Sequence, residues 1–177
     1  MRRFLDTLYR AAGALAALCV LAIFVLMIYA SAGRGFGWRV GIVNDLVAWL
    51  CAAAAFLAMA TAFRNGDFVR VTLLIDALSP PVRRVFEIVS LAVAALAIGY
   101  LAWWAARFTY ESWQFKDMAG GLLVVPMWVP QMSFVVGAAL FFVAVVDELV
   151  CVLRGARPTY VRLVEERHAR GDFSEDL

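Results

Sequence analysis

The chain has 177 residues, of which 64% are hydrophobic and 17% are charged, and its formal net charge is +2. This hydrophobic share and the mean hydropathy of +0.82 exclude an ordinary soluble domain, in which only about 45–50% of residues are apolar. So small a net charge does not by itself indicate a function. The high hydrophobicity leads us to expect membrane lipids around the chain, and we expect no nucleic acid partner.

Four stretches without a charged residue follow one another along the chain. They are Ala11–Gly33, Leu46–Phe63, Ile88–Ala106 and Met118–Val146. Each is close to or longer than the roughly 18–20 residues that a helix needs to cross the hydrocarbon of a bilayer. We therefore predict an all-α integral membrane protein whose domain 1–155 has four transmembrane helices. The predicted spans are about 11–33, 44–64, 85–107 and 126–150, and residues 156–177 form a cytoplasmic tail.

The first stretch also has features of a cleavable signal peptide. Arg2 and Arg3 precede it, and the small residues Ala30-Ser31-Ala32 end it. The apolar part of a signal peptide is only about 7–15 residues long, which is shorter than Ala11–Gly33. We therefore expect this segment to be retained as the first span.

Basic residues are divided unevenly between the two sides of the predicted spans. Twelve of the 16 Lys and Arg residues lie before span one, between spans two and three, or after span four. By the positive-inside rule, these segments and both termini are cytoplasmic. The indole rings mark the opposite side, at or near the outer ends of the spans: Trp38, Trp49, Trp103, Trp104, Trp113 and Trp128.

The cysteines and the histidine do not indicate a redox centre. Cys19, Cys51 and Cys151 are too far apart for a CxxC pair. The only histidine, His168, lies in the tail, where it cannot be an axial haem ligand inside a helix bundle. The sequence also has no nucleotide-binding or metal-ligand motif. We expect no catalytic residue, cofactor or metal, so the chain is not expected to be an enzyme such as a membrane oxidoreductase.

Ion-coupled transporters hold ionisable residues inside the membrane. Here the acidic residues nearest to the spans lie at span ends: Asp45, Glu87, Glu111, Asp147 and Glu148. The alternative of a self-contained four-span transporter acting as an oligomer needs a carboxylate near the middle of span one, and Ala11–Gly33 has none. We expect that the chain does not transport a substrate by itself.

The second span has small residues at intervals of four, at Ala54, Ala58 and Ala62. Such a stripe lets helices approach closely in lipid, either inside the chain or against another protein. Arg64 falls in the last turn of this span, and Gly66 is placed to form a left-handed cap.

Residues 67–79 separate spans two and three and have mixed character. As a helix they place one group of apolar side chains on a single face: Phe68, Val71, Leu74, Ile75 and Leu78. Asp67 is positioned as N-cap, and Pro80-Pro81 end the segment. A helix of about 12 residues is only about 18 Å long and cannot span a bilayer. We predict a short amphipathic interfacial helix.

The fourth span opens with two prolines four residues apart. Pro126 suits a first helical turn, where its missing N–H costs nothing, whereas Pro130 is expected to kink or delay the helix. Gly120-Gly121 before them indicates a turn. We expect mainly structural roles here, with contact to a partner as the alternative.

Two segments resemble a known family. They are NDLVAWLCAAAAFLAMATAFRNGDFVRVTLLIDAL and GGLLVVPMWVPQMSFVVGAALF. Both are similar to segments of the DctQ-like small permease subunit of tripartite ATP-independent periplasmic (TRAP) transporters. The matching positions in the first segment are Asp45, Trp49, Phe56, Leu57, Arg64, Gly66, Asp67, Val69 and Val71. Phe68 and Thr72 depart from the family, which often has a histidine and an acidic residue there.

The resemblance implies a small non-catalytic subunit in the bacterial inner membrane. It would brace a large DctM-like permease subunit that takes up an organic acid anion with sodium, and a DctP-like periplasmic binding protein would deliver the anion. The expected partner-interface or structural residues are Asp45, Trp49, Arg64, Gly66, Asp67, Arg70, Pro126, Trp128 and Pro130.

Overall fold

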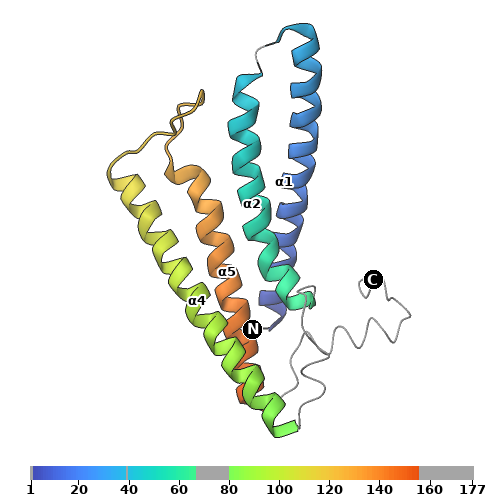
Figure 1. The fold of residues 1–177 in the computed structure, drawn as a ribbon, viewed down its shortest axis with the longest axis vertical. Helices are drawn as coiled ribbons and strands as arrows, with labels where there is room; N and C mark the ends of the chain where they lie inside the picture. The colour runs from blue at the N-terminus through green and yellow to red at the C-terminus, as the bar shows by residue number, and fades with distance from the viewer. Residues whose placement is uncertain (1, 39, 67–79, 156–177) are drawn as a thin grey trace, which may run out of the picture.

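The structure, a computed structural model, describes residues 2–38, 40–66 and 80–155 (Figure 1). The helices are α1 Arg2–Phe36, α2 Gly41–Asn65, α4 Pro80–Gln114 and α5 Trp128–Leu153. Each is long and apolar enough to cross a membrane, so the chain is an all-α integral membrane protein with four transmembrane helices. The expected interfacial helix at 67–79, with Asp67 and Arg70, and the tail at 156–177 lie outside the described residues.

The helices form two antiparallel hairpins, α1–α2 and α4–α5, which meet through α2 and α5. The main packing contacts therefore give the spatial order α1, α2, α5, α4. In this open arrangement α1 and α4 are the edge helices (Figure 1). We call the end with Asp6, Arg64 and Leu153 the terminal end, and the end with the α1–α2 turn the loop end.

The edge helices are longer than a bilayer requires. Each has 35 residues, or about 52 Å at 1.5 Å per residue, against a hydrocarbon thickness of about 30 Å. The predicted spans 11–33 and 85–107 are the central parts of these helices, and the charged turns extend beyond them.

The charge-free parts of α4 and α5 end at different levels toward the loop end. An added Cβ on Gly99 would meet the ring of Phe142, and Ala106 and Val135 line one cavity, so these residues are level in the two antiparallel helices. Arg107 on α4 is therefore level with the second turn of α5. From the level of Arg107, the charge-free part of α5 continues for about 9 Å toward the loop end.

Small residues bring α2 and α5 into direct contact. An added Cβ on Gly137 would lie 2.5 Å from the carbonyl carbon of Phe56 and 2.6 Å from its oxygen. Ala138 is only 1% exposed. The rings of Phe56 and Phe134 pack edge to face, with centroids 4.1 Å apart. Close packing of backbones and the contact between these two rings hold the two hairpins together here.

The expected alanine stripe contributes to packing inside the chain. Ala54 is buried, and Ala58 packs against a cluster formed by α1 and α2, whose members are Ala12, Ala16, Ala53 and Leu57. Internal packing is therefore the role that the structure gives to these two positions.

The end of α2 confirms the left-handed cap expected at Gly66. This residue has φ 85°, and its N–H donates to the carbonyl oxygens of Ala62 and Phe63. A residue with a Cβ would be strained in this conformation.

The start of α5 differs from the expectation. The helix begins at Trp128, so Pro126 precedes it and pairs with Met118 in an isolated bridge. The N–H of Met127 donates to the carbonyl oxygen of Asp117 at 2.9 Å, which ties the residue before the helix to the preceding loop. Pro130 lies in the first turn, where no N–H has an intrahelical partner, so it removes no helical hydrogen bond.

Candidate functional site

Charged residues in the described helices lie toward the helix ends. Asp45 lies near the start of α2 and Arg64 lies near its end, and no charged residue in α5 precedes Asp147. No three or more His, Cys, Asp or Glu residues in the described part of the chain are placed to hold a metal. The candidate sites are therefore the polar contacts that join helices and loops at the two ends of the bundle.

At the terminal end, Arg64 connects α2 to α1. Its guanidinium group forms a salt bridge with Asp6 and lies over the ring of Tyr9, 5.1 Å from the centroid. The hydroxyl of Thr61 donates to the backbone oxygen of Tyr9 at 2.7 Å. We call Asp6, Tyr9, Thr61 and Arg64 the terminal polar cluster.

The terminal polar cluster also reaches α5. Tyr9 is 2% exposed and packs with Ala60 and Ala144, so three helices meet at its ring. Glu148 on α5 is also buried. The hydroxyl of Tyr9 has no hydrogen-bond partner among the described residues. A polar group buried among helices is costly unless it is paired. Arg64 lowers its own cost by its salt bridge with Asp6 and by lying over the ring of Tyr9.

A second arginine joins the start of α4 to the end of α5. Arg84 donates from Nη2 to the backbone oxygen of Leu153 at 3.3 Å and to that of Val152 at 3.5 Å. A cation suits this place because the last carbonyl groups of a helix lack intrahelical partners and carry partial negative charge. The sequence indicates only a topological role for Arg84, through the positive-inside rule. Its position after Pro80-Pro81, beside a helix end, was the available signal for this role.

At the loop end, Asp45 holds the loop between α4 and α5. Its Oδ2 accepts the N–H of Leu122 at 3.1 Å, and Gly121 lies so close to the carboxylate that a Cβ would clash. An added Cβ on Gly41 would likewise meet Leu122. The structure thus gives Asp45, a candidate interface residue, a contact inside the chain.

Replacing Asp45 by Ala should loosen this loop without unfolding the helices. The lost hydrogen bond is worth about 1 kcal/mol, so we expect about fivefold faster amide hydrogen exchange at Leu122 and its neighbours. Asp45→Asn is the matched control because an amide oxygen can still accept the bond. Equal exchange in the Ala variant and the wild type would show that Asp45 does not restrain the loop.

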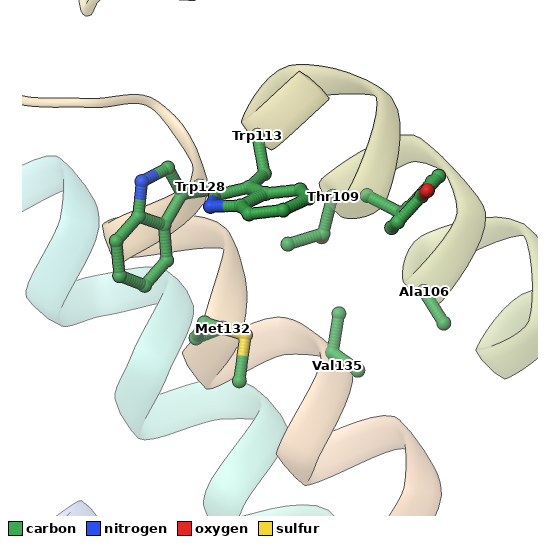
Figure 2. Close-up of a pocket in the computed structure, with 7 residues that line it drawn as sticks. Ala106, Thr109, Trp113, Trp128, Met132 and Val135 are labelled. Carbon is green, nitrogen blue, oxygen red and sulfur yellow. The ribbon is translucent and has the colours of Figure 1, made fainter. Parts of the chain in front are cut away.

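Trp128 contributes to a cavity between α4 and α5 near the loop end (Figure 2). The cavity volume is about 240 Å³. The lining residues are Ala106, Thr109, Tyr110, Trp113, Trp128, Met132 and Val135. Trp49 lies elsewhere, half-buried on α2. The structure does not bring the expected site residues together in one place, because Arg64 and Gly66 are at the terminal end and Asp45 and Trp128 are at the loop end.

The fold and the placement of charges define a four-span integral membrane protein whose described helices carry their charges toward the ends. The family model for "Tripartite ATP-independent periplasmic transporters, DctQ component" matches residues 34–155. The chain belongs to this family, as the two sequence segments indicated, and is the small membrane component of a TRAP transporter. Among curated proteins, none matches the chain.

Proposed function

We propose that this component braces a large permease subunit in the bacterial inner membrane and has no catalytic activity of its own. The permease would take up an organic acid anion with sodium, and a periplasmic binding protein would deliver the anion. Membership of the DctQ family carries this proposal, because the family is one part of a three-part transporter.

The edge helices supply the surfaces that such a role requires. Large apolar side chains are exposed along α1, among them Leu18 and Phe24, and along α4, among them Leu96 and Trp103. In the membrane these surfaces meet either lipid or another subunit. An open row of helices presents more such surface than a closed four-helix bundle of the same helices.

The terminal end faces the cytoplasm in this proposal, because most basic residues lie in the segments at that end. The loop end then faces the periplasm, on the side where the binding protein docks. The α1–α2 turn and the loop held by Asp45 are the parts of this chain nearest to that partner.

The alternative of a self-contained transporter is not favoured by any contact in the described helices. A coupled transporter needs an ionisable group within the membrane, and the charge-free stretch Leu46–Phe63 separates Asp45 from Arg64 in α2. In α5 the first charged residue is Asp147, close to the terminal end.

Sodium-driven uptake in proteoliposomes tests the proposal. The full chain, the large subunit and the binding protein are reconstituted together, with a labelled anion chosen by thermal-shift screening of the binding protein. We expect uptake only from the complete set, and none when either membrane subunit is left out. Uptake by this chain without the large subunit would instead establish the self-contained transporter.

A further inference from the structure

We infer that Asp45 latches the two hairpins together at the loop end, by fastening the loop between α4 and α5 to the first turns of α2. The carboxylate Oδ2 of Asp45 accepts the N–H of Leu122 at 3.1 Å. Gly121 lies directly against the same carboxylate, and Leu122 lies against Gly41 at the start of α2. We call Asp45, Gly121 and Leu122 the loop latch. This inference does not depend on the proposed function.

The helix α5 does not extend as far toward the loop end as α2 does. Gly137 of α5 is level with Phe56 of α2. Gly41 lies 15 positions before Phe56, and Trp128 lies nine positions before Gly137. At 1.5 Å per residue, α2 therefore continues about 9 Å beyond the start of α5. The loop between α4 and α5 rises to this level (Figure 1), so it joins its hairpin to the first turns of α2 where α5 does not reach.

Hydrogen bonds within the loop connect it firmly to both helices of its own hairpin. The N–H of Asp117 donates to the carbonyl oxygen of Ser112, in the last turns of α4, at 3.0 Å. Asp117 in turn accepts the N–H of Met127, next to the start of α5, at 2.9 Å. Across the loop, the N–H of Ala119 donates to the carbonyl oxygen of Val125 at 2.8 Å. A restraint on the tip of this loop therefore acts on the whole α4–α5 hairpin.

The loop latch acts far from the other contacts between the hairpins. Asp45 lies 11 positions before Phe56, which is about 16 Å along the helix. Further toward the terminal end, the rings of Phe63 and Phe141 pack with centroids 5.6 Å apart. These contacts hold α2 and α5 at the middle of the bundle and toward the terminal end. Loss of the loop latch should therefore let the hairpins separate at the loop end alone.

Two neighbouring glycines allow the loop latch to be opened without changing Asp45. A Cβ on Gly121 would overlap the carboxylate of Asp45, whereas a Cβ on Gly120 meets nothing within 4 Å. Neither glycine has a positive φ, so alanine is compatible with the backbone at both positions. Gly121→Ala should open the latch, and Gly120→Ala is the matched control that should leave it closed.

Distances between paired spin labels test the inference on the full chain in lipid nanodiscs. One pair, at Ile28 on α1 and Phe108 on α4, reports the separation of the hairpins toward the loop end. A second pair, at Leu8 on α1 and Val85 on α4, reports it at the terminal end. All four residues are exposed. Alanine replaces the native cysteines so that only the chosen sites are labelled: Cys19, Cys51 and Cys151.

We expect Asp45→Ala to raise the fraction of molecules with a wider loop-end distance about fivefold, because one hydrogen bond is lost. Gly121→Ala should have the same effect, and neither variant should change the terminal-end distance, which also shows that the bundle is still folded. Asp45→Asn should match the wild type, because its amide oxygen can accept the N–H of Leu122.

An unchanged loop-end distance in both Asp45→Ala and Gly121→Ala would overturn the inference. This holds even if hydrogen exchange at Leu122 becomes faster, because the loop would then move without the hairpins. Equal widening at both ends of the bundle would show a general loosening and would overturn it as well. The same conclusion would follow if Gly120→Ala widened the loop end as much as Gly121→Ala.

Discussion

Replacing Gly137 by Ala should destabilise the protein by about 1–3 kcal/mol, the usual cost of overfilling a packed core. The added methyl group would lie 2.5–2.6 Å from three atoms of Phe56, and two of these belong to the backbone. Backbone atoms inside a helix cannot turn aside as a side chain can, so α2 and α5 must separate. Because this contact joins the two hairpins, we expect a larger loss for Gly137→Leu.

Unfolding in increasing concentrations of a denaturing detergent measures this effect, and Gly35→Ala is the matched control. Gly35 is also helical, but an added Cβ there meets nothing within 4 Å. Alanine favours a helix over glycine by about 1 kcal/mol, so the control should be neutral or more stable than wild type. Equal stabilities of the two variants would contradict the close approach of α2 and α5.

The sequence predicts features that depend on local chemistry or on hydropathy. The four spans follow from stretches such as Ala11–Gly33 that carry no charge and are long enough to cross a bilayer. The cap at Gly66 follows from one glycine just beyond a helix end, where a left-handed conformation costs little. Neither prediction requires knowledge of which helices are neighbours.

The order of the helices could not be predicted in this way. A membrane helix is apolar on nearly every side, so its sequence has no single stripe that marks the face packed against a neighbour. The short distance between Gly137 and Phe56 is therefore visible only in three dimensions. The same holds for Asp45, which the sequence places at the end of a span but not beside Leu122.

The start of α5 shows a third limit. Pro126 is compatible with a first helical turn, and nothing in its immediate neighbours excludes that position. The helix instead begins at Trp128, while Pro126 lies in a bridge with Met118 and the N–H of Met127 donates to Asp117 across the loop. A hydrogen bond between residues ten positions apart in an irregular loop is not encoded in a local pattern.

Replacing Arg64 by Leu should cost about 1–3 kcal/mol and loosen the first turns of α1. Arg64 is 17% exposed and Asp6 is 40% exposed, so the pair is intermediate between a surface pair and a buried one. Without the guanidinium group, Asp6 loses its salt bridge and the ring of Tyr9 loses its cation. Hydrogen exchange along α1 should rise most in the turns around Tyr9.

Arg107→Leu is a control with the same kinds of interaction, made within one helix and in an exposed setting. Arg107 pairs with Glu111 at 3.1 Å, lies over the ring of Trp104 and is 56% exposed. We expect this substitution to cost less than about 0.5 kcal/mol, because exposed ion pairs contribute little. Equal costs for the two arginine variants would show that burial does not strengthen the terminal polar cluster.

A double-mutant cycle separates the Asp6–Arg64 pair from other roles of Arg64. If the pair carries the effect, Asp6→Asn should destabilise the chain, and adding Arg64→Leu should then cost less than it costs alone. If Arg64 instead serves mainly to contact the large subunit, Arg64→Leu should reduce co-purification with that subunit while the stability of the isolated chain stays unchanged. The salt bridge to Asp6 and the position of Arg64 over Tyr9 favour the first result, because both contacts are made within this chain.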